Sequence, residues 1–138
     1  MKVLLDTSVC VDYLRRNPAT IERLFGFKIR DVMIPVHAVA ELEHGIFLAF
    51  NRKAERERVA ALMARYPVLP FGPGAARRAG NLMYTLGRQG LTMKHFDLLI
   101  AAQAIDAGLT LATADADFEP LSGARGLKVA KWSSMQPG

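Results

Sequence analysis

The sequence is poor in cysteine and has no long hydrophobic run. Cys10 is the single cysteine among 138 residues, so an internal disulfide and a zinc cluster of thiolates are both excluded. We expect a small buried thiol in a reducing compartment. The N-terminus has one lysine and then only Val3-Leu4-Leu5 before Asp6, far short of a signal peptide or a membrane span. We therefore expect a cytoplasmic protein with no membrane partner.

Internal repeats, low-complexity tracts and long linkers are also missing, which indicates one domain. The apolar content of 51% is enough for a real core at this length. We assign residues 1–132 to this domain and residues 133–138 to a frayed tail. The chain carries 18 Lys and Arg against 13 Asp and Glu, a net charge of +5, which suits an anionic partner.

Strand and helix patterns alternate along the whole chain. Short apolar runs predict strands at residues 2–5, 32–36, 68–71, 109–113 and 127–130. Helical spacings lie between them, at residues 9–14, 18–25, 37–50, 51–66, 73–89 and 98–107. This order predicts an α/β fold, a three-layer α/β/α sandwich with a mostly parallel central sheet. If the first strand is central, a topological switch point falls beside Asp6.

The stretch Phe96 to Asp115 places two acids at one edge of that sheet. Asp97 precedes an apolar run that is too long for a strand, and Gly108 supplies a left-handed helix end. The following run, residues 109–113, is a buried strand that ends just before Asp115. Because helix and strand run in opposite directions, Asp97 and Asp115 are expected on the same rim.

Two further acids reach this rim by the same geometry. Asp6 follows the first strand, and Glu41 lies about one turn inside the helix after the second strand. Four ionised carboxylates in one place repel each other unless a cation balances them. Oxygen ligands suit Mg²⁺ or Mn²⁺ better than zinc, and such ions bind phosphate and activate water. The four acids therefore predict a site with one or two metal ions for phosphodiester hydrolysis.

Each acid also has a simpler interpretation as a helix cap, because acids near helix starts accept hydrogen bonds from unpaired N–H groups. Thr7, Ser8 and Thr113 flank the acids and could donate hydrogen bonds to the metal ligands. Helix capping by Thr7 and Ser8 and a strand role for Thr113 explain these three residues equally well.

The motifs around the acids resemble those of a known family. They are Leu5-Asp6-Thr7-Ser8, Ala40-Glu41-Leu42-Glu43-His44-Gly45, Phe96-Asp97-Leu98-Leu99-Ile100-Ala101-Ala102 and Thr113-Ala114-Asp115-Ala116-Asp117-Phe118. Their order and spacing resemble the four acidic motifs of PIN-domain nucleases, and most of all the VapC-type toxins of toxin–antitoxin pairs. The resemblance extends from Met1 to Trp132.

The resemblance implies a Mg²⁺- or Mn²⁺-dependent endoribonuclease that a cognate antitoxin keeps inactive. Asp6, Glu41, Asp97 and Asp115 would be its catalytic metal ligands, with Asp117 as an assisting one. Assembly as a homodimer and as a toxin–antitoxin hetero-oligomer is implied as well. Phe96 stands where relatives often have a polar capping residue, which leaves Asp97 itself to cap its helix.

Two other functions stay open at this point. The chain could be a PIN-type nuclease that processes RNA without a toxin role, or a catalytically silent interaction module that keeps the fold. For an RNA substrate, the cations nearest to the acids in sequence are the expected phosphate contacts: Arg15, Arg16, Arg88 and Lys94. For an antitoxin, we expect an apolar groove near the first helices, with Leu24, Phe25, Phe27, Phe47 and Phe50 as candidates.

Overall fold

The computed structural model describes residues 1–121 and 126–132, so the predicted tail at 133–138 lies outside the described residues. Within these ranges one sheet contains β1 (Val3–Leu5), β2 (Val32–Pro35), β3 (Val68–Leu69), β4 (Thr110–Thr113) and β5 (Lys128–Lys131). The strand order is β3-β2-β1-β4-β5, and every neighbouring pair is parallel. The predicted α/β fold with a central first strand is confirmed.

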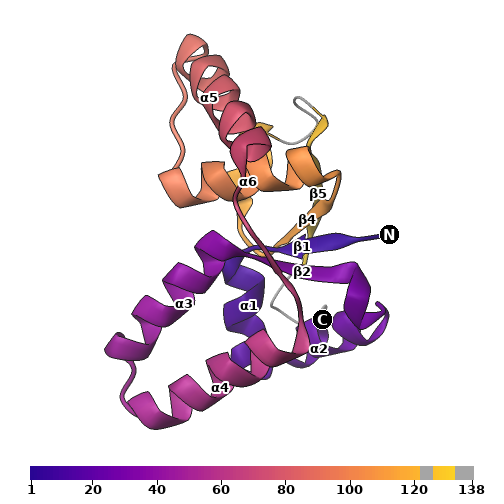
Figure 1. Ribbon diagram of the computed structural model, residues 1–138, viewed down its shortest axis with the longest axis vertical. Coiled ribbons are helices and arrows are strands. Elements are labelled where there is room, and N and C mark those ends of the chain that lie inside the picture. The colour runs from indigo at the N-terminus through magenta and orange to yellow at the C-terminus, as the bar shows by residue number, and fades with distance from the viewer. Residues whose placement is uncertain (122–125, 133–138) are drawn as a thin grey trace.

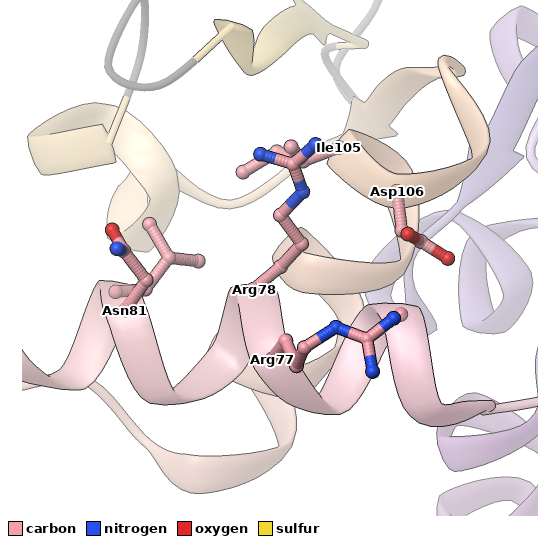
Figure 2. A pocket seen from close by; sticks show the side chains of 7 residues that line it. Arg77, Arg78, Asn81, Ile105 and Asp106 are labelled. Atoms are coloured by element: carbon pink, nitrogen blue, oxygen red, sulfur yellow. The ribbon is translucent and has the colours of Figure 1, made fainter.

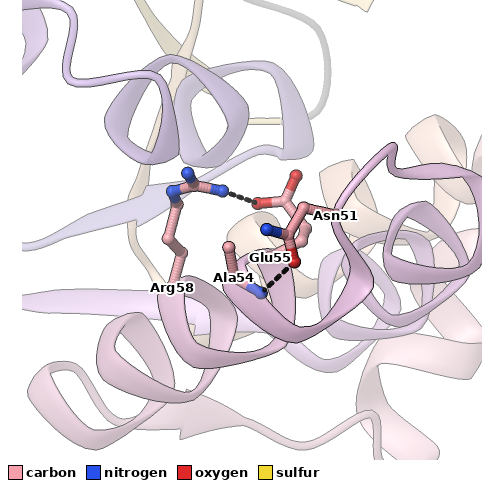
Figure 3. A network of polar contacts seen from close by, with 4 residues as sticks. All are labelled: Asn51, Ala54, Glu55 and Arg58. Carbon is pink, nitrogen blue, oxygen red and sulfur yellow. Dashed lines mark hydrogen bonds and ion pairs between the residues drawn. The ribbon is translucent and has the colours of Figure 1, made fainter.

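The helices that connect the strands begin and end where the sequence supplies caps. They are α1 (Thr7–Leu14), α2 (Pro18–Phe25), α3 (Val36–Leu48), α4 (Arg52–Arg65), α5 (Pro73–Arg88) and α6 (His95–Ala107), with short 3-10 helices η1 (Ile29–Asp31) and η2 (Ala116–Leu121). The side chain of Asn17 caps α2, Asn51 caps α4 (Figure 3), and Gly108 ends α6 in the left-handed conformation. None of the helices in the described ranges could cross a bilayer.

The helices cover both faces of the sheet. Figure 1 shows α1 to α4 on one side of the strands, and α5 and α6 on the other. The reason is the handedness of the connections. The chain moves from β1 to β2 and β3 in one direction, and then reverses to reach β4 and β5. Right-handed crossovers in opposite directions place their helices on opposite faces.

The hydrophobic core lies on both faces of the central strands β1 and β4 and includes the buried side of α6. Val3, Leu4 and Leu5 are fully buried, as a central parallel strand requires. Gln103 of α6 is buried too, and its Nε2 donates to the carbonyls of Leu69 and Pro70, which ties α6 to the edge strand β3.

The helical spacing of α5 groups Met83 with the inward-facing residues of this helix, and that prediction is wrong. Ala75, Ala79, Leu82 and Leu86 are buried against α6, as the helical spacing predicts, but Met83 is 47% exposed. Met83 follows Leu82 by one residue, about 100° around the helix, so it lies beyond the single face that α6 covers.

The register of the central strands determines which residues meet at the edge of the sheet. Leu5 of β1 pairs with Ala112 of β4, and the N–H of Asp6 donates to the Ala112 carbonyl at 3.0 Å. The residues that follow these partners, Asp6 and Thr113, are therefore neighbours at the C-terminal edge. This edge is where parallel sheets place ligands at a switch point.

Candidate active site

Asp6 is the most buried acid at this edge, with 3% of its surface exposed. It precedes α1 as the N-cap residue, and its Oδ1 accepts from the Val9 N–H at 3.1 Å and from the Ser8 hydroxyl at 2.6 Å. Its Oδ2 accepts from the Thr113 hydroxyl at 2.5 Å. Three donors thus fix both oxygens of one carboxylate. The interpretation of Thr7 and Ser8 as helix caps is wrong, because Asp6 itself caps the helix.

Thr113 and Ser8 connect the end of β4 to the turn between β1 and α1. The Asp115 N–H donates to the Thr113 hydroxyl at 2.9 Å, and the Ala114 N–H donates to the Ser8 hydroxyl at 3.0 Å. These bonds hold the segment that carries Asp115 against Asp6. The sequence predicts that Asp6 and Asp115 share a rim. The structure shows that the hydroxyl groups of Ser8 and Thr113 hold them there.

Glu41 reaches the same place from α3. It is half-buried, and its Oε1 accepts a hydrogen bond of 2.6 Å from the Thr7 hydroxyl. Thr7 is the first residue of α1 and follows Asp6 directly. Glu41 is therefore held beside Asp6 by a bond between residues 34 positions apart in the sequence.

Asp97 lies in the first turn of α6 and is half-buried. The prediction that it caps this helix is wrong, because α6 begins at His95 and Lys94 occupies the N-cap position. The start of α6 lies against the start of α3, where the Phe96 ring stacks on His37 with centroids 5.5 Å apart. Since Asp97 follows Phe96, and His37 precedes Glu41 by one helical turn, the segments that carry Asp97 and Glu41 lie next to each other.

The electrostatics of the site reflect burial and nearby negative charge. Burial raises the pKa of the Asp6 carboxyl, the bonds from Ser8, Thr113 and Val9 oppose this, and the charge of Asp115 adds to it. Burial together with the charges of Asp6 and Glu41 also raises the pKa of the Cys10 thiol, which stays protonated. The site therefore offers carboxylate and hydroxyl oxygens, and Cys10 contributes no thiolate.

A cleft of about 580 Å³ leads away from these acids between α1, α3 and α4. Glu41 and Thr7 line one part of it, and Arg15, Arg16 and Arg58 line the rest with several apolar residues. Arg58 approaches Glu55 at 3.7 Å, an exposed ion pair along α4 (Figure 3). A weak pair of this kind leaves the guanidinium able to change partners.

A second, more apolar groove of about 320 Å³ adjoins the cleft between α1, α2 and α4. It is lined by Tyr13, Leu14, Arg16, Ile21, Leu24, Phe25, Arg58, Ala61, Arg65 and Tyr66. Leu14, Arg16 and Arg58 belong to both cavities and form a wall between them.

The residues predicted to contact phosphate lie in different parts of the structure. Arg15 and Arg16 line the cleft, and Lys94 is exposed at the start of α6. Arg88 is exposed in the last turn of α5 and lines none of these cavities. Arg58 is not among the predicted contacts, because the charged run at residues 52–58 has the mixed-sign pattern of a solvated helix face. The side chain of Asp117 lies outside what the structure describes.

A third cavity, also of about 320 Å³, lies between α5 and α6 and contains none of the four acids. Arg77, Arg78, Asn81 and Asp106 line it (Figure 2). A Cβ atom at Gly74 would lie 2.5 Å from Oδ1 of Asp106, so any other residue there would require the exposed Asp106 carboxylate to move.

Comparison with known proteins settles the family. The model of the PIN domain matches residues 3–123. The chain belongs to the PIN domain family. It is 36% identical to ribonuclease VapC10 of Mycobacterium tuberculosis over 80% of each chain, and 27% identical to the tRNA(fMet)-specific endonuclease VapC of Shigella flexneri over 96% of this chain and 99% of that one. The resemblance to VapC-type PIN domains is confirmed.

A solved structure supports the same placement within the PIN domain family. DNA-bound VapBC from Salmonella typhimurium superposes with a TM-score of 0.87 at 25% identity, over 96% of this chain and 98% of that one. Its sheet and helices therefore correspond to those of this chain almost throughout.

PIN-domain nucleases depend on divalent metal ions, and the donors at this site suit one in their chemistry. The oxygens of Asp6, Glu41 and Asp115, with the hydroxyls around them, are the hard ligands that Mg²⁺ and Mn²⁺ prefer. Among the side chains that the structure describes, no three His, Cys, Asp or Glu residues converge closely enough to hold an ion. Glu41 is instead turned toward Thr7, and Asp6 toward Ser8 and Thr113.

The raised pKa of Asp6 gives a prediction for the metal-free protein. The folded state binds a proton at Asp6 more readily than the unfolded chain does, so the ionised group lowers stability as the pH rises above its ordinary pKa of 3.8. Asparagine caps helices as well as aspartate. We therefore expect Asp6→Asn to raise the free energy of unfolding at pH 7, measured by urea denaturation with EDTA.

The gain should shrink as the pH is lowered toward 3.8, since wild-type Asp6 then becomes neutral as well. An Asp6→Asn variant that is less stable than wild type at pH 7 would contradict this account of the site.

Proposed function

We propose that this chain is a Mg²⁺- or Mn²⁺-dependent endoribonuclease whose metal ligands are Asp6, Glu41, Asp97 and Asp115. The observation that carries the proposal is the buried Asp6 carboxylate, linked through hydroxyl groups to the segments of Glu41 and Asp115 at the switch point of the sheet. Relatives named as ribonucleases share the family. Asp117 is a further candidate ligand at the fourth position.

When bound, the metal would lower the pKa of the attacking water and stabilise the leaving oxygen of the phosphodiester. The residues of the chain prepare for this by fixing orientation. Ser8, Thr113 and the Val9 N–H hold Asp6 in one rotamer, and Thr7 positions Glu41. Hydroxyl partners of this kind orient metal ligands and sustain their affinity.

The cleft beside Glu41 suits the sugar–phosphate backbone of the RNA. Arg15, Arg16 and Arg58 lie along it, with their charges on the path to the acids. Basic side chains that follow a strand supply most of the affinity for single-stranded RNA, and this contribution is sensitive to salt. Lys94, at the start of α6, would contact phosphate on the other side of the acids. Arg88, which is outside the cleft, is the weakest of the predicted contacts.

The second part of the proposal is a toxin role with a cognate antitoxin as partner. The apolar groove between α1, α2 and α4 would receive an antitoxin helix, because it combines exposed Phe25 with Tyr13 and Ile21. Of the other residues expected there, Leu24 lines the groove although it is only 4% exposed. Phe27, Phe47 and Phe50 do not line it, and Phe27 packs on Trp132.

Assembly and location complete the proposal. Exposed Met83 and Tyr84 on α5 would contact a second copy in a homodimer, within a larger toxin–antitoxin hetero-oligomer. Residues 1–132 form the nuclease domain, and the protein acts in the cytoplasm.

The catalytic proposal is tested by Asp97→Asn. Losing an outer partner of a metal ligand reduces activity by about 10- to 100-fold, so losing the ligand itself should reduce RNA cleavage by more than about 100-fold. The matched control is Asp106→Asn, which removes an exposed acid near the other end of α6. It should cleave at the wild-type rate, measured on total bacterial RNA with Mg²⁺ or Mn²⁺.

Calorimetric titration with Mn²⁺ provides a second reading that needs no substrate. Wild type and Asp106→Asn should bind the ion, and Asp97→Asn should bind it more weakly. Equal cleavage by Asp97→Asn and wild type in excess Mg²⁺ would reject the metal assignment. Absence of Mn²⁺ binding by the wild type would favour a silent interaction module.

The cleft assignment is tested by Arg58→Gln. We expect weaker binding of a single-stranded RNA oligonucleotide, and a salt slope reduced by about 0.7 for each phosphate contact that is lost. Arg56→Gln is the control, since Arg56 is exposed on the same helix but lines neither cavity. If both variants bind alike at every salt concentration, the path does not follow this cleft. The measurement is fluorescence anisotropy without divalent metal.

The toxin role is tested by expression in a bacterial host. The chain alone should arrest growth, and co-expression with the product of its neighbouring gene should restore it, because the partner covers the groove and the acids. The Asp97→Asn variant should not arrest growth. Active nuclease without growth arrest would instead support a role in RNA processing.

A further inference from the structure

Three aromatic rings from distant parts of the chain lie in a row beside the acids. His37 comes from the first turn of α3, Phe71 from the segment before α5, and Phe96 from the first turn of α6. The His37 ring is 4.9 Å from Phe71, at an interplanar angle of 44°, and 5.5 Å from Phe96, at 15°. Phe96 and His37 are therefore nearly parallel, as offset-stacked rings are.

Phe96 is the outer ring of this row, with 41% of its surface exposed, whereas His37 and Phe71 are half-buried. The Nε2 atom of His37 is shielded from solvent and has no hydrogen-bond partner among the described residues. His37 thus supports Phe96, and Phe71 in turn packs against His37.

The location of the row connects it with the acidic site. Phe96 is followed by Asp97, and His37 precedes Glu41 by one turn of α3. Lys94 and His95, which come just before Phe96, are both exposed. A cation, an exposed ring and a carboxylate therefore occur in succession where α6 begins. This order matches the parts of a nucleotide, which joins an anionic phosphate to a flat base.

We propose that Phe96, supported by His37 and Phe71, is a stacking platform for an unpaired nucleobase of the RNA next to the bond that is cut. The inference rests on the ribonuclease function proposed above. Base–aromatic stacking requires a base that is free of a duplex, so the platform selects single-stranded RNA. A protein partner would need a broader apolar surface than one phenyl ring, and the groove near Phe25 supplies that elsewhere.

The test compares two oligomers of equal charge, oligoadenylate of eight nucleotides and its abasic ribose-phosphate counterpart. Binding is measured by anisotropy on Glu41→Gln protein, which keeps α6 intact. The Phe96-containing protein should bind the oligoadenylate on the order of tenfold more tightly than the abasic oligomer. Adding Phe96→Leu should abolish this preference, because leucine keeps the apolar volume without the flat ring. Phe96→Tyr should retain it.

Stacking also has a direct signature. A 2-aminopurine base in the oligomer should lose fluorescence on binding to protein with Phe96 or Tyr at this position, and not with Leu. The control is Phe50→Leu, which removes a fully exposed aromatic ring between α3 and α4 that lines none of the cavities. It should leave both the base preference and the quenching unchanged. Circular dichroism melts should show that the Phe96→Leu variant is folded.

Two results separate the inference from the function on which it rests. If wild type cleaves RNA and Phe96→Leu keeps the full preference for oligoadenylate, the platform is rejected and the nuclease proposal stands. If wild type neither cleaves RNA with Mn²⁺ nor binds either oligomer, both are rejected.

Discussion

The arrangement of this protein depends on one buried acidic group, the carboxylate of Asp6. The Asp6 carboxylate is buried at the point where the chain reverses its direction across the sheet, and three hydrogen-bond donors make its charge tolerable there. One of those donors belongs to β4 and the other two to α1. The requirement of a single group therefore fixes how the first strand, its helix and the neighbouring strand meet.

The same requirement explains why the site is ready for a cation. Burial and the charge of Asp115 both favour a neutral Asp6, so the fold keeps this group in an environment that opposes its ionised form. A divalent ion would reverse that preference, because its charge stabilises the carboxylates around it. Cys10 lies close enough to feel both Asp6 and Glu41, but its protonated thiol leaves the oxygen ligands without a competitor.

Much of this could be predicted from the sequence because it depends on topology. A strand that ends at Asp6, a helix that begins before Glu41 and a central first strand together bring acids to one edge, whatever the side chains do in detail. The acceptors to which the hydroxyl groups donate hydrogen bonds could not be predicted in this way. Thr7 donates to a residue on another helix, and Thr113 donates to Asp6 from the end of another strand. Local capping rules consider only neighbours in sequence and do not include such partners.

The start of α6 shows a second limit of sequence reasoning. Lys94-His95-Phe96 contains no usual capping residue, so the sequence indicates Asp97 as the cap, three residues later than the observed cap Lys94. The aromatic row and the place of Arg58 in the cleft depend on segments that meet only after folding. Periodicity in α4 correctly predicts an exposed face, yet it cannot reveal which exposed arginine borders a cavity.

Arg16 ends α1 with a φ of 58°, and its N–H donates to the Tyr13 carbonyl. Glycine adopts this left-handed conformation freely, whereas a residue with a Cβ atom loses about 1 kcal/mol. The chain accepts that penalty at the wall shared by the two cavities. A glycine in place of Arg16 would remove this backbone strain and make the protein more stable. It would also remove one of the two positive charges from the wall between the cavities.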